Sequence, residues 1–424
     1  MRAIVYPGNV TGEQIAPASK SSMQRACAAA LLHVGNTTIL NPGHSNDDLA
    51  AIDVIQKLGA TVVQTASQLN VTSQGVQPIG TEFNCGESGL GIRMFSPIAA
   101  MSSSSMLIQG AGSLLKRPMH FFDTIFPLLG IKISSQKGFL PIKIQGPLKP
   151  ATITVDGSLS SQFLTGLLMA YAASDATGLV IHVSDLKSKP YIDLTLSVLN
   201  TFGWNVKHHN YESFEFLPHA PLAETIEYTV EGDWSGAAFL LVAGAIAGPI
   251  KVKGLQLNST QADKAVMQAL QSTNATITYE HDGILIGPNK KNELLAFEFD
   301  ATDCPDLFPP LVALAAVCNG VSKIKGVSRL AHKESDRGIT LQAEFKKLGI
   351  NITLEGDTMK IYGGTDIQSN TVFSQHDHRI AMACGVAALR ANGPVEIVDA
   401  ESINKSYTDF FEHLIQLGIK VQLQ

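Results

Sequence analysis

The stretch IQKLGATVV at residues 55–63 contains the pattern from which the fold can be deduced. The end of an amphipathic helical segment meets a Leu-Gly pair, and alternating residues typical of a strand follow directly. Glycine in this place suits the left-handed backbone conformation that closes many helices. The stretch therefore predicts a helix that ends at Gly59 and a strand that follows it.

The same order of helix, turn residue and strand recurs five more times. The further copies read FPLLGIKI, LNTFGWNV, LQSTNATI, FKKLGINIT and IQLGIKVQL. The turn residues of the six copies are Gly59, Gly130, Gly203, Asn274, Gly349 and Gly418, which are 71, 73, 71, 75 and 69 residues apart. Self-similarity at a fixed period indicates repeated structural units, and units of this length fill the 424 residues six times.

A second, strongly apolar segment occurs once in each unit. These segments begin near Ser19, Ser88, Ser160, Ser235, Pro305 and Asp377. A helix that is apolar around most of its circumference belongs in an interior, whereas the other helix of each unit is amphipathic. Each unit therefore reads as βαβαββ with its apolar helix buried.

Six such units predict an α/β fold of the inside-out barrel kind, with sheets wrapped around buried central helices. We expect two domains of three repeats, because 424 residues are comfortable for two domains of about 200. The chain should cross between them twice. Residues 1–18 and 231–424 would then form a discontinuous domain, and residues 19–230 an inserted one.

Composition excludes several other classes of protein. The net charge of -6 gives no electrostatic reason to expect nucleic acid as a partner. The apolar stretch 234–250 is short and rich in Gly and Ala, so a buried helix is expected there rather than a membrane span. Five scattered cysteines without a CxxC pair indicate free thiols in a reducing cytoplasm. We expect a soluble, cytoplasmic protein.

Polar residues gather at the starts of the apolar helices. Helix starts carry unpaired N–H groups and partial positive charge, so they favour anions. Ordinary N-capping explains the serines and aspartates at these places. It does not explain the cations, which oppose the helix dipole and cost stability; these are Lys20, Arg25, Arg93, Arg379, and Lys333 with Arg337. The cations indicate a polyanionic small-molecule ligand.

Acid–base chemistry would need carboxylates among these cations. The nonapeptide RLAHKESDR at 329–337 holds six ionisable side chains in a chain that is only 16% charged. Its Glu334, together with Asp306 in DCPDLFPPL, could accept or donate a proton. Helix capping after Pro305 is the alternative reading of Asp306, and capping of an exposed helix is the role expected of Asp336.

Eight motifs resemble those of the enolpyruvyl transferases and, among them, the EPSP synthase family. They are SKSSMQR, KRPM, DGSLSSQFLTGLLM, KSKPYIDLTL, VEGDWSGAAFLL, HKESDR, DHRIAMA and NKSYTDFF, in family order between residues 19 and 411. The resemblance implies two domains of three βαβαββ units each. It also implies transfer of the enolpyruvyl group of phosphoenolpyruvate to the 5-hydroxyl of shikimate 3-phosphate, in aromatic amino acid biosynthesis. No metal or organic cofactor is expected.

The resemblance also implies the site residues. For shikimate 3-phosphate they are Lys20, Ser21, Arg25, Ser160, Ser161, Gln162, Ser188, Tyr191, Asp306 and Lys333. For phosphoenolpyruvate they are Lys20, Gly89, Arg117, Gln162, Arg337, Arg379 and Lys405. Asp306 is similar in position to the general base, Glu334 to its partner in proton transfer, and Lys20 to a cation beside the reacting oxygens. Which carboxylate moves which proton stays open at this point.

One segment departs from the family pattern. Where the family reads Asn-Ala-Gly-Thr-Ala-x-Arg-Pro, this chain has Glu87-Ser-Gly-Leu-Gly-Ile-Arg-Met, so Glu87, Leu90 and Met94 are unusual. Glu87 adds a negative charge near a site for anions. Arg329 and His376 each stand where the family often has Asn. Sensitivity to glyphosate, which competes for the phosphoenolpyruvate pocket, could therefore change in either direction.

The sequence leaves two alternative functions open. A UDP-N-acetylglucosamine enolpyruvyl transferase shares the fold, but its reactive loop cysteine is missing from residues 97–118. A non-catalytic anion-binding relative would be favoured by Glu87 and Leu90, but the complete set of charged residues favours an enzyme. We expect a monomer whose two domains close when the anions bind, since both domains supply ligands.

Overall fold

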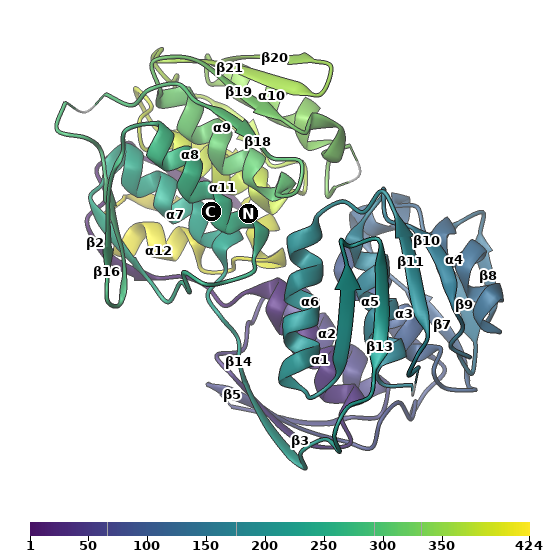
Figure 1. The fold of residues 1–424 in the computed structure, drawn as a ribbon. Helices are drawn as coiled ribbons and strands as arrows, with labels where there is room; N and C mark the ends of the chain where they lie inside the picture. Colours follow the sequence, from purple (N-terminus) through teal and green to yellow (C-terminus); the bar gives the residue numbers. More distant parts are fainter. Residues whose placement is uncertain (66, 175, 292, 332) are drawn as a thin grey trace. The chain divides into compact units, whose positions relative to one another are not determined.

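The computed structural model describes residues 1–65, 67–174, 176–291, 293–331 and 333–424. They form two compact units. Unit 1 consists of Met1–Pro17 and Gly232–Gln424, and unit 2 consists of Ala18–Glu231. In each unit, helices lie inside and small sheets lie outside (Figure 1).

Within the described residues, the strands form three four-stranded sheets in each unit, and these six sheets share one topology. In unit 2 the strand orders are β14(Thr225–Thr229)-β3(Gly35–Leu40)-β5(Gln68–Ser73)-β4(Thr61–Gln64), β6(Glu82–Asn84)-β7(Ser105–Gln109)-β9(Phe139–Gln145)-β8(Lys132–Gln136) and β10(Ile153–Asp156)-β11(Val180–Ser184)-β13(Ser213–Leu217)-β12(Asn205–His209). In unit 1 they are β2(Gly12–Ile15)-β15(Ile250–Lys253)-β17(Gly283–Gly287)-β16(Thr276–Glu280), β18(Glu298–Asp300)-β19(Gly320–Lys325)-β21(Thr358–Gly363)-β20(Asn351–Glu355) and β22(Thr371–Phe373)-β23(Val395–Val398)-β1(Arg2–Val5)-β24(Val421–Leu423). The first pair in each order is parallel and the other two pairs are antiparallel.

Three sheets are completed by strands that are distant in sequence. In unit 2, β14 pairs with β3, so that Thr225 lies opposite Asn36. In unit 1, β1 lies between β23 and β24, and β2 pairs with β15. The repeat is therefore permuted in three of its six copies.

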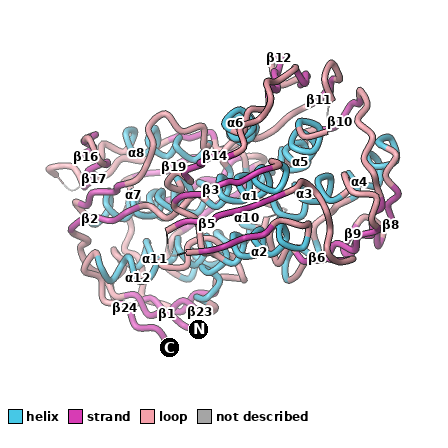
Figure 2. The backbone as a smooth tube through the Cα atoms, turned by 90° about the horizontal axis from the view of Figure 1, so that it is seen from below, coloured by secondary structure: helices cyan, strands magenta, loops and turns pink. Residues whose placement is uncertain are grey.

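The predicted buried helices are confirmed. They are α1(Lys20–Leu32), α3(Gly89–Ala99) and α5(Ser161–Ala172) in unit 2, and α7(Trp234–Ala247), α9(Phe308–Val317) and α11(His378–Ala388) in unit 1. Nearly all of their residues are buried, and the few that are not include Lys20, Ser21 and Gln162 at the helix starts. The outer helices are α2(Asn46–Lys57), α4(His120–Ile125), α6(Lys189–Thr201), α8(Val266–Ser272), α10(Arg337–Lys347) and α12(Phe410–Gln416). Figure 2 shows the helices in cyan and the strands in magenta.

All six turn residues adopt the left-handed conformation. Their φ angles are +112° at Gly59, +72° at Gly130, +90° at Gly203, +64° at Asn274, +82° at Gly349 and +96° at Gly418. Gly has no Cβ to clash there, and Asn is among the few other residues that tolerate this region. The local sequence therefore predicts the turn that separates helix from strand.

Two helix starts lie close to the expected places and show how they are formed. The fourth buried helix begins at Trp234, next to the expected Ser235, and Asp233 caps it by accepting the Ser235 N–H at 3.0 Å. The fifth opens with a 3-10 turn, Pro305–Leu307, before α9. The apolar stretch at 234–250 is the buried helix α7, as predicted, followed by the start of β15. Within the described ranges, every helix lacks the length or hydropathy for a membrane span.

Helices α3 and α5 approach each other closely at Gly166. A Cβ on Gly166 would lie 2.7 Å from the carbonyl oxygen of Arg93, so no larger residue fits without a shift. This close packing sets the starts of the two helices side by side. As a result, the Arg93 Nη1 donates to the Gln162 Oε1 at 2.7 Å.

Candidate functional site

The charged cluster of unit 1 is centred on Arg337, the first residue of α10. Its side chain is 1% exposed. Nε donates to Asp377 Oδ2 at 2.8 Å, Nη1 donates to Asp306 Oδ1 at 2.6 Å, and Nη2 also pairs with Glu334. Three carboxylates thus converge on one buried guanidinium. The pKa of Arg337 is raised well above its usual value because these carboxylates outweigh the burial that would lower it.

Asp306 receives two more cations. Lys333 Nζ lies 3.1 Å from its Oδ1, and Arg379 Nη2 lies 3.3 Å from its Oδ2. Burial would raise the pKa of Asp306, but Arg379, Lys333 and Arg337 together hold it well below its usual range. Asp306 is consequently an ionised carboxylate that can accept a hydrogen bond from a hydroxyl.

Burial has the opposite effect on the neighbouring lysine. It lowers the pKa of Lys333, and the charge of Asp306 only partly offsets this. Burial would lower the pKa of Arg379, but the carboxylates of Asp306, Asp263 and Asp233 together raise it. These cations therefore differ in how readily they release a proton. His332, which belongs to the charged nonapeptide, lies outside the described residues.

Lys405 and Asp263 are two further polar residues of this unit. Lys405 Nζ donates to the carbonyl oxygen of His376 at 2.8 Å, while the imidazole of His376 pairs with Asp399 at 3.0 Å. Asp263 is buried and accepts the hydroxyl of Ser235. Burial, with the charge of Asp306, raises the pKa of Asp263 to about 6.

In unit 2, five residues gather near the start of α3. The Arg93 guanidinium contacts Gln162 and lies over the ring of Phe163, 4.9 Å from its centre. Arg117 reaches the same place from the loop after β7, since a Cβ on Gly89 would lie 2.6 Å from its Nη1. Two guanidinium groups and the first N–H groups of a helix thus face a common point, which favours an anion.

Arg25 makes a separate, fully buried site. It donates to Thr195 Oγ1 at 2.9 Å, to the Ser21 carbonyl oxygen at 2.8 Å, to the Tyr191 carbonyl oxygen at 3.2 Å and to Thr165 Oγ1 at 3.4 Å. All four acceptors are neutral. Burial lowers the pKa of Arg25 to about 10, which still leaves it charged near neutral pH. Among the described residues, the hydrogen-bond acceptors of this buried cation are neutral oxygens, an environment suited to an anionic ligand.

The remaining predicted residues of unit 2 lie at helix starts. Lys20 opens α1, and its Nζ lies 3.0 Å from Asp47 Oδ2. Ser160 caps α5 by accepting the Gln162 N–H at 3.2 Å, and Ser161 is the buried first residue of that helix. Ser188 precedes α6 with a left-handed φ of +56°.

Each unit thus contains part of both predicted ligand sets. Lys20, Gly89, Arg117 and Gln162 lie in unit 2, and Arg337, Arg379 and Lys405 lie in unit 1. Asp306 and Lys333 belong to unit 1, whereas the other residues predicted for shikimate 3-phosphate belong to unit 2. The unusual Leu90 and Met94 are buried in α3.

Sequence reasoning missed several residues that hold these side chains. The sequence predicts Asp377 only as a helix start, and it does cap α11 by accepting the Arg379 N–H at 3.0 Å. Its pairing with Arg337 had no sequence signal. The acceptors Thr165 and Thr195 of Arg25 are single threonines inside helices, and Asp47 lies in an ordinary first turn. Thr165 and Thr195 are identified as acceptors only in the folded structure, where the buried Arg25 side chain lies next to them. Asp336 does cap α10, as predicted, by accepting the Ile339 N–H.

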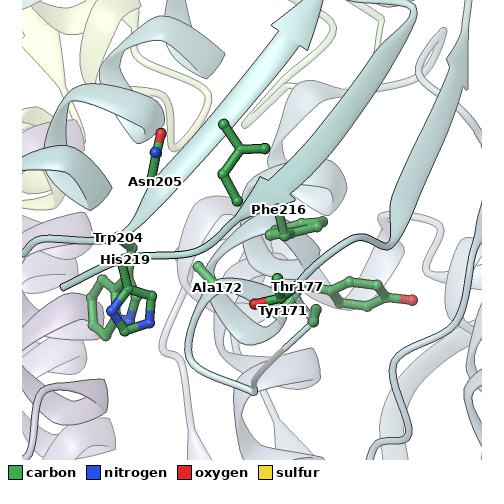
Figure 3. A pocket seen from close by; sticks show the side chains of 9 residues that line it. Tyr171, Ala172, Thr177, Trp204, Asn205, Phe216 and His219 are labelled. Carbon is green, nitrogen blue, oxygen red and sulfur yellow. The ribbon is translucent and has the colours of Figure 1, made fainter. Parts of the chain in front are cut away.

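A surface hollow of about 600 Å³ in unit 2 lies elsewhere. It is lined by Leu32 and Ala172, the last residues of α1 and α5, and by Trp204 and His219. Figure 3 shows a smaller pocket beside it, with the side chains of Tyr171, Phe216 and Trp204. The predicted residues Lys20 and Ser21 of α1, and Ser161 and Gln162 of α5, lie at the opposite ends of these two helices.

Comparisons with known proteins identify the family of this chain. The family model described as EPSP synthase (3-phosphoshikimate 1-carboxyvinyltransferase) matches residues 5–414. The chain is 35% identical to a 3-phosphoshikimate 1-carboxyvinyltransferase of Clostridium botulinum, over 98% of this chain and 96% of that one. It is 34% identical to the Aeropyrum pernix protein of the same name, over 99% and 96%.

Solved structures give the same result. An EPSP synthase of Acinetobacter baumannii superposes with a TM-score of 0.83 at 25% identity, with all of both chains covered. An enolpyruvyl transferase of Streptomyces tendae superposes with a TM-score of 0.77 at 16% identity over 99% of this chain and 98% of that one, which supports the fold alone.

Proposed function

Since this chain belongs to the EPSP synthase family and transfers the enolpyruvyl group of phosphoenolpyruvate to shikimate 3-phosphate, we propose that its polar residues bind these two substrates. These residues are the charged cluster around Arg337 in unit 1 and the polar side chains at the helix starts of unit 2. The convergence of Arg337, Arg379 and Lys333 on Asp306 is the observation that carries the proposal. Such a carboxylate stays ionised next to cations that an anionic substrate can also engage.

Phosphoenolpyruvate is the proposed ligand of the arginines at helix starts. Its phosphate and carboxylate would be held by Arg337, Arg379, Lys405, Lys20, Arg117, Gln162 and the N–H groups near Gly89. Arginine suits this role because its fork of N–H donors matches the oxygens of phosphate and carboxylate. The set supplies several positive charges to a dianion or trianion, which offsets the desolvation of the ligand.

Shikimate 3-phosphate is the proposed ligand of the deep site around Arg25. The residues assigned to it are Lys20, Ser21, Arg25, Ser160, Ser161, Gln162, Ser188, Tyr191, Asp306 and Lys333. Buried Arg25 has only neutral acceptors among the residues described around it, which supports an anionic ligand nearby. Asp306 would accept the hydrogen bond of the 5-hydroxyl.

The chemistry runs in two steps. In the first step, the oxygen of the 5-hydroxyl bonds to C2 of phosphoenolpyruvate while Asp306 takes the hydroxyl proton. At the same time, C3 gains a proton from Glu334 or Lys20. The tetrahedral intermediate then loses a proton from C3 while the bond from C2 to the phosphate oxygen breaks. Inorganic phosphate and the enolpyruvyl ether are the products. Holding two reactants in line can lower the barrier by roughly 7–11 kcal/mol.

Phosphate release by the purified protein tests the assignment of residues. Wild-type protein with both substrates should release phosphate, and Asp306→Asn should lose at least about 100-fold in kcat. Asp300→Asn, an exposed aspartate paired with Lys325, is the matched control and should be unaffected. Replacement of shikimate 3-phosphate by UDP-N-acetylglucosamine should abolish phosphate release. Full activity of Asp306→Asn would refute the role given to Asp306.

We also propose that the enzyme acts as a cytoplasmic monomer. Five free, buried cysteines fit a reducing compartment. Light scattering during size-exclusion chromatography should give the mass of one 45.2 kDa chain.

A further inference from the structure

Glu87, the unusual residue before α3, is bound to a second loop of unit 2. Its Oε2 accepts the Ser113 N–H at 3.1 Å. Gly112 lies so close, with a φ of +54°, that a Cβ on it would overlap the Glu87 carboxylate. Ser113 and Gly112 both belong to the 3-10 turn Gly112–Lys116. The carboxylate is therefore directed into the backbone of this turn.

The same turn carries Arg117. Arg117 follows the last residue of the turn, and its Nη2 donates to Ser113 Oγ at 3.3 Å. Its Nη1 is the atom that would lie 2.6 Å from a Cβ on Gly89. Ser113 is thus contacted on its backbone by Glu87 and on its side chain by Arg117. Glu87 thus contacts the backbone of the turn. Gly89, two residues further along the chain, lies next to the guanidinium at the end of the Arg117 side chain.

We propose that Glu87 is a positioning residue for phosphoenolpyruvate binding. It anchors the turn Gly112–Lys116 and so places the Arg117 guanidinium at the start of α3. This inference rests on the proposed role of Arg117 in binding phosphoenolpyruvate. A carboxylate that accepts a backbone N–H forms a charge-assisted hydrogen bond, which is stronger than a neutral one. In this way a negative charge beside an anion site strengthens the site.

The turn has a second tether that does not involve Glu87. The Ala111 N–H donates to the Gly86 carbonyl oxygen at 2.7 Å. Because this backbone bond survives any change of the Glu87 side chain, the loop should stay attached and the variants should fold. The change expected is a less fixed Arg117.

Two variants separate anchoring from charge. Glu87→Ala removes the acceptor, and Glu87→Gln keeps an oxygen acceptor without the charge. The control is Glu82→Ala, because Glu82 in the same repeat accepts a hydrogen bond from Gln109 at 2.9 Å but is exposed. We expect Glu87→Ala to raise the KM for phosphoenolpyruvate roughly tenfold, with kcat and the KM for shikimate 3-phosphate within about twofold. Glu87→Gln should keep the KM for phosphoenolpyruvate close to that of the wild type, and Glu82→Ala should change neither KM nor kcat.

Several results would overturn the inference. A lower KM for phosphoenolpyruvate in both Glu87 variants would show that Glu87 only repels the substrate. An equal rise in both KM values would show a general structural role. Hydrogen exchange at the Ser113 amide tests the anchoring without substrate: it should be faster in Glu87→Ala, and unchanged exchange would refute the anchoring. If Arg117→Ala leaves the KM for phosphoenolpyruvate unchanged, the site assignment fails, and the exchange result still decides whether Glu87 holds the turn.

Discussion

Asp377 holds Arg337 through two nitrogens of the guanidinium. Oδ2 lies 2.8 Å from Nε, and Oδ1 lies 3.2 Å from Nη2. Both side chains are almost fully buried, at 0% and 1% exposed. Asp377 also caps α11 and accepts the hydroxyl of Ser335 at 3.1 Å. One carboxylate therefore links the starts of two helices that carry Arg337 and Arg379.

Asp377→Asn should damage both stability and activity. The amide removes one of the three carboxylates that converge on the buried guanidinium and leaves Asp306 and Glu334 in place. We therefore expect the free energy of unfolding to fall by about 1–3 kcal/mol. Because Arg337 loses its fixed position, kcat/KM should fall at least about 100-fold. Urea unfolding and phosphate release measure the two effects. Glu298→Gln, which breaks the exposed pair with Lys323, is the control and should cost little. Normal activity in a folded Asp377→Asn protein would contradict this role.

Gly89→Ala should weaken phosphoenolpyruvate binding and leave the fold intact. The new methyl group would meet the end of the Arg117 side chain at 2.6 Å, and that flexible side chain can move away. A displaced guanidinium should raise the KM for phosphoenolpyruvate by roughly ten- to 100-fold. Gly80→Ala is the matched control, since a Cβ there meets nothing within 4 Å. Steady-state kinetics decide the matter, and equal KM values for the two variants would be the contrary result.

Thr195→Val should act on the other substrate. The change keeps the shape of the side chain but removes the oxygen that accepts from Arg25 Nε at 2.9 Å. Because Arg25 is fully buried, one of its donors loses its partner, and the KM for shikimate 3-phosphate should rise roughly tenfold. Thr201→Val, at an exposed place on the same helix, should be silent. A rise in the KM for phosphoenolpyruvate alone would contradict the assignment of Arg25.

Asp48 should give the protein a pH-dependent stability that is independent of the site. Burial raises the pKa of its carboxyl to about 6, despite hydrogen bonds from Ser45. The protonated form is favoured in the fold, so this contribution is fully present below the unfolded pKa of about 4 and is lost as the pH rises through about 6. Relative to Asp48→Asn, wild-type protein should lose about 2–3 kcal/mol between pH 4 and 6.

Urea unfolding at pH 4, 5, 6 and 7 measures this difference. The control is Asp53→Asn, which changes an exposed carboxylate on the same helix. Parallel pH profiles for wild type and Asp48→Asn would show that burial does not shift this group.

The sequence by itself determined the repeat, the buried helices and the family. Each of these features is local: a left-handed residue such as Gly59 or Asn274, an apolar helix such as α7, or a short motif such as HKESDR. Backbone sterics and hydrophobic burial act within a few residues of each position, so periodicity and composition report them directly.

Only the tertiary structure decided which partners hold the charged side chains. Asp377 reaches Arg337 across 40 residues, Thr195 reaches Arg25 across 170, and Glu87 reaches Ser113 across 26. The pairing of β14 with β3 in unit 2 is of the same kind. A hydrogen bond depends on distances near 3 Å and on direction, and for residues far apart in the chain these are set by how the helices and sheets pack. The sequence thus indicated which charged residues could form the site, and the packing of helices and sheets determined which acceptor each of their donors contacts.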